Sequence, residues 1–383
     1  MKTEVPLGIV HPTMLEPFRV RFEVEDEVIT DAEITFNAVY RGVERMLEGV
    51  ALKKANMITE RVCGICSHVH LWNSCRVSEL AGEVTISDRA KYIRLLGAEL
   101  ERLHSHTLFF GHAFEVLGHE TFGYRSFALR EPIMRMMQRF SGNRVHYAIP
   151  IIGGVRPRAD LDQETIADMK KMVAELGTTL KKFTDRILDD PPIMSRLEDT
   201  GTLSKKDAKA THAVGPTARA SGIKWDWRKQ IPEYEGLEFD MVVLEDGDNK
   251  SRVVARVLEV FESIKLINQI LDNLPTGDVV TQVKPILDTE FVKSYLEAPR
   301  GELYHSLKVD TQGNVRNYRI RPPTTTNLAA VEKACVGDHL TDGILTVVSC
   351  DPCICCANRA LVVDKDGGTE KMIEFTGGKI CIL

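Results

Sequence analysis

Two cysteine pairs with the same spacing lie near opposite ends of the 383-residue chain. Cys63 and Cys66 occur in the segment Arg-Val-Cys-Gly-Ile-Cys, and Cys353 and Cys356 occur in Asp-Pro-Cys-Ile-Cys-Cys. An i, i+3 pair presents both sulfurs on one side of a helical turn, and two such pairs brought together form a four-sulfur pocket for a soft metal ion. The sequence therefore predicts a cysteine-ligated metal centre.

Inert core thiols, a disulfide framework and a structural zinc site are the alternatives. Free cysteine packs as a small apolar residue, but core packing explains poorly two pairs that lie beside glycine or proline and charged residues. A disulfide framework is disfavoured because the chain is long and no secretory segment is apparent. A structural zinc site remains an alternative, although the cysteine pairs of such sites usually lie within a few tens of residues of each other. Here nearly the whole chain separates Cys66 from Cys353, which favours a functional centre.

Composition limits the classes of partner and compartment. The 49 Lys and Arg residues are outnumbered by 55 Asp and Glu residues, which gives a formal net charge of -6. No basic surface for nucleic acid is therefore expected. No stretch approaches the ~18 uncharged apolar residues that a membrane helix needs. The nine cysteines and the missing signal segment indicate a reducing, cytoplasmic setting, in which the chain could still dock on a membrane partner.

Hydrophobic patterning predicts a mainly α chain with small β elements, an α+β fold with a central helical bundle. Residues 18–36 alternate apolar and polar side chains, which predicts an N-terminal β-hairpin, and residues 87–118 show the stripe of a long helix with Ser87 as N-cap. Strands are expected within 301–320, and a surface insertion at 223–248. Further helices are predicted at 41–50, 126–144, 162–188, 251–274, 288–296, 325–336 and 342–348. The distant cysteine pairs favour a single folding unit over residues 1–383.

Five segments in a fixed order carry a family resemblance: His11–Glu16, Arg41–Glu44, Glu60–Cys66 followed by His70, Ala298–Glu302, and Asp351–Arg359. With them, nearly the whole chain resembles the large subunit of nickel-iron hydrogenases. Within that superfamily it is similar to the energy-converting, membrane-associated branch, which is related to the 49-kilodalton quinone-site subunit of respiratory complex I. The fold that the resemblance implies is that of the hydrogenase large subunit.

The resemblance implies specific roles for the site residues. Cys63, Cys66, Cys353 and Cys356 would hold nickel, and Cys66 and Cys356 would also bridge to an iron that carries carbon monoxide and cyanide. A cysteine thiolate is a plausible base for the proton released when dihydrogen is split, and Cys356 is counted among the catalytic residues.

Three further residues are implied around these cysteines. Glu16 matches the glutamate that relays the proton, while Arg300 and Asp351 match a pair beside the metal ions that orients or polarises a ligand. In isolation, Glu16 and Arg300 would be interpreted as loop or turn residues and Asp351 as a cap. Their expected roles therefore depend on the resemblance.

Two positions depart from the family pattern. Arg359 stands where many relatives have a histidine that binds a metal ion together with the glutamate matching Glu44. Arginine stays protonated and cannot be a metal ligand, so we predict an ion pair between Arg359 and Glu44. Ser105, between His104 and His106, replaces a carboxylate of classical hydrogenases. Its effect on the nickel site is not predictable from the sequence.

The C-terminal tail allows two interpretations. The resemblance allows residues 360–383 to be a peptide like the one that many relatives lose, at this position, once nickel has been inserted. The segments 361–364 and 371–375, around Gly367 and Gly368, equally fit a permanent hairpin. The sequence does not decide between them. Cys75, Cys335, Cys350, Cys355 and Cys381 have no implied role and are expected to be buried thiols.

The predicted function is the catalytic subunit of an energy-converting nickel-iron hydrogenase. The chain has no spare four-cysteine pattern for an iron-sulfur cluster, and no nicotinamide or flavin is expected on it. The resemblance therefore implies a small subunit with an iron-sulfur cluster, ferredoxin-like subunits, a membrane arm that translocates ions, and reduced ferredoxin as donor. The chain would lie peripherally on the cytoplasmic face of the membrane. A complex I type subunit and a sulfur-reducing relative are disfavoured because all four cysteines are present, and a structural zinc scaffold is the non-enzyme alternative.

Overall fold

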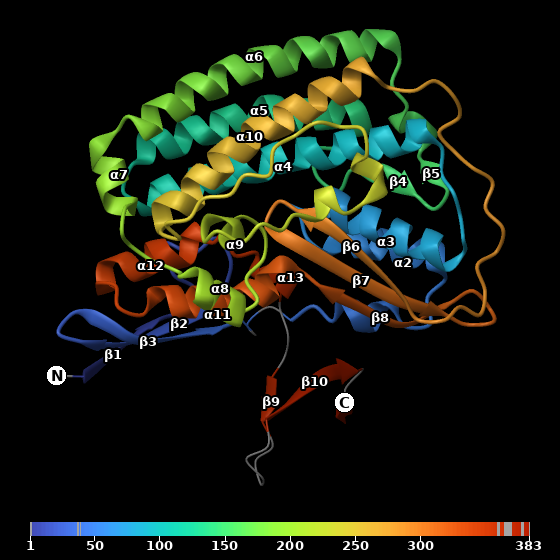
Figure 1. Cartoon of the computed structure of the whole chain (residues 1–383). Coiled ribbons are helices and arrows are strands. Elements are labelled where there is room, and N and C mark those ends of the chain that lie inside the picture. Colours follow the sequence, from blue (N-terminus) through green and yellow to red (C-terminus); the bar gives the residue numbers. More distant parts are fainter. Residues whose placement is uncertain are drawn as a thin grey trace.

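A computed structural model describes residues 2–36, 38 and 40–357, together with the backbone of three strands beyond residue 360. The described chain is mainly helical with small antiparallel sheets, which confirms the predicted fold class. Figure 1 shows the long helices on one side of the molecule and the three-stranded sheets on the other.

Long helices form the central bundle predicted from the sequence (Figure 1). They are α4 (Asp88–Val116), α5 (Glu120–Ser141), α6 (Gln163–Leu188) and α10 (Asn249–Asp272). The side chain of Ser87 accepts a hydrogen bond from the first turn of α4, and Asp162 does the same for α6, so both helices begin at true N-caps. Phe114 of α4, Phe122 of α5 and Phe183 of α6 pack ring against ring and hold the three helices together.

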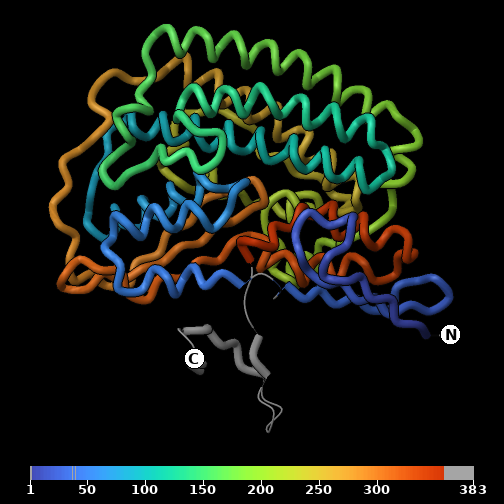
Figure 2. Tube along the Cα trace, turned by 180° about the vertical axis from the view of Figure 1, so that it is seen from behind, coloured from blue at the N-terminus to red at the C-terminus, as the bar shows by residue number. Residues whose placement is uncertain are grey.

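The N-terminal sheet has the order β1-β2-β3, with β1 (Lys2–Leu7), β2 (Arg19–Glu25) and β3 (Val28–Thr35). The predicted hairpin is β2 and β3, whereas β1 was not predicted. Phe18, Val20 and Phe22 line the inner face and pack against Val331 of α11 (Pro323–Cys335) and Val347 of α12 (Leu340–Ser349). Segments from the two ends of the chain therefore lie side by side, as both views show (Figures 1 and 2).

A second antiparallel sheet lies beneath the bundle, with the order β6-β7-β8. Its strands are β6 (Val292–Ala298), β7 (Gly301–Val309) and β8 (Val315–Arg321). The strands expected within 301–320 are confirmed, but the helix predicted at 288–296 is wrong. Ser294, Leu296 and Ala298 are buried at a spacing of two, and β6 pairs with β7 from Val292 to Ala298.

Short elements connect these layers. Before the bundle lie α1 (Val43–Leu47), α2 (Leu52–Thr59), η1 (Glu60–Val62) and α3 (Ser67–Ala81), and between α5 and α10 lie β4 (Pro150–Ile151), β5 (Gly154–Val155), η2 (Pro157–Ala159), α7 (Pro191–Leu197), α8 (Lys205–Ala210), α9 (Gly215–Ala220), η3 (Trp227–Lys229) and η4 (Pro232–Tyr234). The segment 223–248, expected as a surface insertion, includes η3 and η4. Within it, Asp226 and Arg228 are fully buried and form an ion pair of 2.7 Å.

The chain continues through α13 (Ile354–Ala357) into β9 (Leu361–Val363), β10 (Glu370–Thr376) and β11 (Lys379–Ile382). β10 pairs antiparallel with both β9 and β11. This pairing agrees with the hairpin pattern of the tail. Whether the tail is removed in the mature protein stays a prediction.

Candidate metal centre

Sulfur atoms from the two cysteine pairs meet inside the protein. The Sγ atoms of Cys63 and Cys353 are 3.4 Å apart, and those of Cys353 and Cys356 are 2.8 Å apart. The sulfurs of these three residues all lie within 4.8 Å of one another, and all are buried. Two thiolates bound to one metal ion at about 2.3 Å stand about 3.3–3.8 Å apart. The pocket therefore needs only small shifts of the sulfurs to hold a metal ion.

Cys66 lies at the edge of this cluster, and its sulfur contacts a cation. Nη1 of Arg300 donates to Cys66 Sγ at 3.3 Å, while the backbone N–H of Cys66 donates to Cys63 Sγ at 3.1 Å. Hydrogen bonds from Cys353, Cys356 and Cys66 hold the pKa of the Cys63 thiol well below its usual value. The hydrogen bond to Cys63 and burial raise the pKa of Cys66. Of the four thiols, that of Cys63 therefore loses its proton most readily.

The first cysteine pair is positioned by the start of α3. Cys66 is the N-cap residue of α3, so the free N–H groups of the first turn lie directly after it. The carboxylate of Glu101, on α4, accepts from the N–H groups of His68 at 2.6 Å and Val69 at 3.0 Å. Glu101 is fully buried, and burial raises its pKa well above the usual value. A side chain of the bundle therefore fixes the loop that carries the first pair.

The second cysteine pair is positioned in the same manner. The N–H of Cys353 donates to Oγ1 of Thr324 at 3.0 Å. The carboxylate of Glu16 accepts from the N–H groups of Ile354 and Cys355, the latter at 3.1 Å. Glu16, predicted as the proton relay, therefore lies against the turn that carries Cys353 and Cys356.

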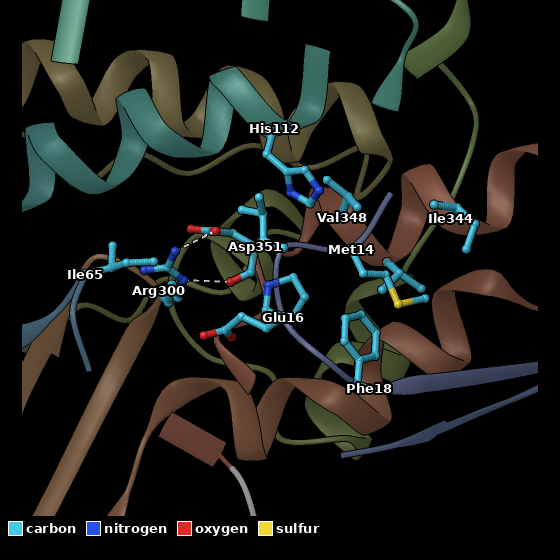
Figure 3. A pocket seen from close by; sticks show the side chains of 12 residues that line it. Met14, Glu16, Phe18, Ile65, His112, Arg300, Ile344, Val348 and Asp351 are labelled. Carbon is cyan, nitrogen blue, oxygen red and sulfur yellow. Dashed lines mark hydrogen bonds and ion pairs between the residues drawn. The ribbon is translucent and has the colours of Figure 1, made fainter. Parts of the chain in front are cut away.

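Arg300 and Asp351 form the buried ion pair expected beside the cysteines (Figure 3). Arg300 Nη2 lies 2.7 Å from Asp351 Oδ1, and Nε donates to the Asp351 carbonyl at 2.8 Å. The remaining nitrogen, Nη1, donates to Oγ of Ser105 at 2.9 Å. Burial alone would lower the pKa of Arg300, but the negative charges of Asp351 and Cys66 raise it well above its usual value. The guanidinium therefore stays charged beside the sulfurs.

Close backbone packing sets the position of Arg300. It occupies the turn between β6 and β7, which rests on the start of α9. A Cβ atom on Gly215 would lie 2.4 Å from the carbonyl oxygen of Arg300, and both Gly215 and Gly301 have positive φ, at 65° and 126°. Only glycine permits this approach without strain. The turn therefore cannot carry Arg300 toward the cysteines unless both glycines are kept.

A pocket opens beside the ion pair (Figure 3). Its lining combines apolar side chains, among them Met14 and Phe18, with Glu16, Arg300 and Asp351. His112 of α4 also lines it, and the imidazole Nε2 bonds the carbonyl of Thr13 at 2.9 Å. Glu16 therefore contacts the turn that carries Cys353 and Cys356 and also lines this pocket.

The predictions for the other residues around the site are in part confirmed, in part wrong and in part untested. The carboxylate of Glu44 accepts from the N–H of Ile320 at 2.7 Å, but Arg359 lies outside the described residues, so the predicted ion pair stays a prediction. Cys75, Cys335 and Cys350 are buried, as expected, whereas the prediction is wrong for Cys355, which is partly exposed. The side chain of Cys381 lies outside the described part of the chain. Glu101 was missed by the sequence reasoning, although an acidic residue between Leu100 and Leu103 in the apolar stripe of α4 was an available signal.

Comparison with known proteins shows to which family the chain belongs. The family of the 49-kilodalton subunit of respiratory-chain NADH dehydrogenase matches residues 117–295 and 287–359, and the nickel-dependent hydrogenase family matches residues 41–116. The membrane-bound hydrogenase subunit alpha of Pyrococcus furiosus is 35% identical over 386 residues, which cover 95% of this chain and 89% of that relative. The chain belongs to the superfamily of nickel-iron hydrogenase large subunits and complex I 49-kilodalton subunits.

Proteins named for other activities are also similar to this chain. A subunit of the NADH-quinone oxidoreductase of Dehalococcoides mccartyi is 31% identical over 352 residues, which cover 89% of this chain and 95% of the relative. A chain in the structure of the membrane-bound sulfane sulfur reductase, an archaeal respiratory membrane complex, has a TM-score of 0.88 and 25% identity, covering 94% of this chain and 98% of its own. Overall similarity therefore establishes an oxidoreductase family, and the site residues must separate the activities. No described helix is long and apolar enough to cross a membrane.

Proposed function

We propose that this chain is the catalytic subunit of a membrane-associated, energy-converting nickel-iron hydrogenase that interconverts dihydrogen with protons and electrons. One observation carries the proposal. Both cysteine pairs are intact, and the sulfurs of Cys63, Cys353 and Cys356 lie together in a buried cluster, with Cys66 at its edge. A structural zinc site is a weaker explanation, because the cysteine pairs of such sites usually lie within a few tens of residues of each other, whereas nearly the whole chain separates Cys66 from Cys353.

The donor set fits a nickel-iron group. Cys63, Cys66, Cys353 and Cys356 would hold nickel, and Cys66 and Cys356 would share their sulfurs with an iron that carries carbon monoxide and cyanide. Thiolates are soft ligands, and a buried cluster excludes competing water. When bound, this group supplies the redox centre at which dihydrogen is made or split.

The residues of the chain would move the proton and hold the charge. In the proposed mechanism, the Cys356 thiolate accepts a proton and passes it to Glu16, which lies against the same short helix and lines the adjoining pocket. Burial and the neighbouring Glu16 carboxylate raise the pKa of Cys355 to about 12, so this cysteine stays a thiol. Arg300 stays charged beside Cys66, and Asp351 fixes its orientation.

Electrons must reach the site through other chains. The described cysteines outside the two pairs are single residues without a four-sulfur arrangement. We therefore propose a small subunit with an iron-sulfur cluster, ferredoxin-like subunits and reduced ferredoxin as the donor. The names of the relatives support assembly with a membrane arm, which would place this chain on the cytoplasmic face and couple the reaction to ion translocation.

Metal analysis with infrared spectroscopy on the anaerobically purified native complex tests the proposal. We expect nickel together with stretching bands of iron-bound carbon monoxide and cyanide. Zinc alone, without such bands in an intact preparation, would leave the cysteines as a structural site and refute the proposal.

The structural match to the sulfane sulfur reductase favours one second candidate, a sulfur-reducing subunit. Assays of the same complex separate the two activities. With reduced ferredoxin as donor, we expect dihydrogen evolution. Sulfide production from polysulfide without dihydrogen evolution would instead support the second candidate.

A further inference from the structure

The side chain of Arg41 joins the two segments that carry the cysteines. Nη1 donates to the carbonyl oxygen of Arg61 at 2.8 Å, and Nη2 donates to that of Val62 at 2.5 Å. Nη2 also donates to the carbonyl oxygen of Cys355 at 2.5 Å, across a sequence separation of 314 residues. One guanidinium group therefore binds backbone on both sides of the sulfur cluster.

These carbonyl groups lie next to the sulfur ligands. The carbonyl of Val62 belongs to the same peptide plane as the nitrogen of Cys63, and that of Cys355 to the same plane as the nitrogen of Cys356. Because a peptide unit is rigid, fixing its oxygen restrains the start of the following residue. Arg41 therefore restrains one cysteine of each pair without touching a sulfur atom.

We propose that Arg41 is a positioning residue that sets the distance between the two cysteine pairs and so determines the metal affinity of the site. This inference rests on the proposed function only in that the sulfurs bind a metal ion. Local sequence cannot hold the two pairs together, since residues from opposite ends of the chain meet here. The planar fork of arginine binds several acceptors at once, which a lysine ammonium group does less well.

Arg89 provides a matched control. Its guanidinium likewise binds carbonyl oxygens of distant segments, those of Pro275 and Leu161, each at 2.7 Å. Its remaining partner is Asp160, so none of these contacts involves a cysteine segment. Loss of Arg89 therefore reports the general effect of removing such an arginine.

Anaerobic titration of the purified, metal-free full-length chain with Co²⁺ tests the inference. Thiolate-to-metal charge-transfer bands report binding, and the d–d bands report the geometry of the ligands. We expect Arg41→Met to weaken Co²⁺ binding at least ~10-fold and to shift the d–d bands. Arg41→Lys should restore part of the affinity, and Arg89→Met should bind as the unchanged chain does.

Each possible result of the titration either supports or overturns the inference about Arg41. Unchanged affinity and bands in Arg41→Met would overturn the inference, as would equal weakening in Arg89→Met, which would indicate general destabilisation. A full-length chain that binds no Co²⁺ through its thiols would overturn it as well. If the native complex lacks nickel but Co²⁺ binding still depends on Arg41, the proposed function fails and the inference stands.

Discussion

The buried pair of Arg300 and Asp351 allows a quantitative test of what holds the site together. Arg300 gives Asp351 two hydrogen bonds, and the second carboxylate oxygen, Oδ2, accepts none among the described residues. Arg300→Met would therefore leave a buried carboxylate without its cation. Breaking a buried pair in this way costs about 3–5 kcal/mol of unfolding free energy. We expect a loss of this size for Arg300→Met.

A double-mutant cycle separates the ion pair from other effects. Asn is the matched replacement for Asp351, because that residue has a positive φ of 57°, which Asn tolerates. In the cycle with Arg300→Met, the double variant should be less destabilised than the sum of the single variants, by about 1–3 kcal/mol. Urea unfolding of metal-free protein is the assay, because bound metal would add its own stabilisation. Additivity within about 0.5 kcal/mol would refute the coupling of the two residues.

Three other residues make contacts that lead to tests of function and stability. Glu16→Gln keeps the acceptor for the helix N–H groups but cannot relay a proton, so dihydrogen turnover should fall about 100-fold or more at unchanged nickel content; full activity would contradict the relay. Burial lowers the pKa of His106 to about 4 from 6.5, against the opposing effect of Glu259, so the folded state disfavours the charged imidazole. Stability should therefore fall as the pH drops below 6.5, by about 2 kcal/mol at pH 5, and urea unfolding of His106→Asn should lack this part of the loss. Arg219→Met should cost about 3–5 kcal/mol in the same assay, because Glu259 and Glu297 lose ion pairs of 2.6 and 2.7 Å; a loss below about 1 kcal/mol would show that the network reorganises.

The elements predicted correctly from the sequence are those that local sequence signals mark. The hairpin of β2 and β3 and the capped helices α4 and α6 are confirmed, because alternation, an apolar stripe and a side-chain cap are local signals. By contrast, α3 has no side-chain N-cap and 12 of its 15 residues are buried, so neither a cap nor a polar face marks this helix in the sequence. The segment that forms β6 spaces Val292 and Leu296 four residues apart, which resembles a helix until the pairing with β7 is known.

The site residues, too, were predictable only where a local pattern or a family motif marks them. The cysteines follow from residue type and spacing, and the family resemblance supplied Glu16, Arg300 and Asp351. Arg41 and Glu101 were not predictable as positioning groups, because their partners are backbone carbonyl and N–H groups of distant segments. Such acceptors and donors exist at almost every residue, so sequence offers no way to choose among them.

The two cysteine segments are held in place by polar side chains from other parts of the fold, which bind their backbone groups. Each pair lies at the start of a helix, and each helix start is bound by a carboxylate from another part of the fold, Glu101 for α3 and Glu16 for α13. The two segments are joined to each other through backbone carbonyls by Arg41. Loss of Glu101 or Glu16 would leave N–H groups at a helix start without a partner, which is unfavourable away from water, so the segment would move. Loss of Arg41 would remove the link between the two segments. Substitutions at Glu101 and Arg41 should therefore alter metal binding more than their distance from the sulfurs suggests, while substitutions at Glu16 that remove the acceptor, unlike Glu16→Gln, should combine that effect with loss of the proton path.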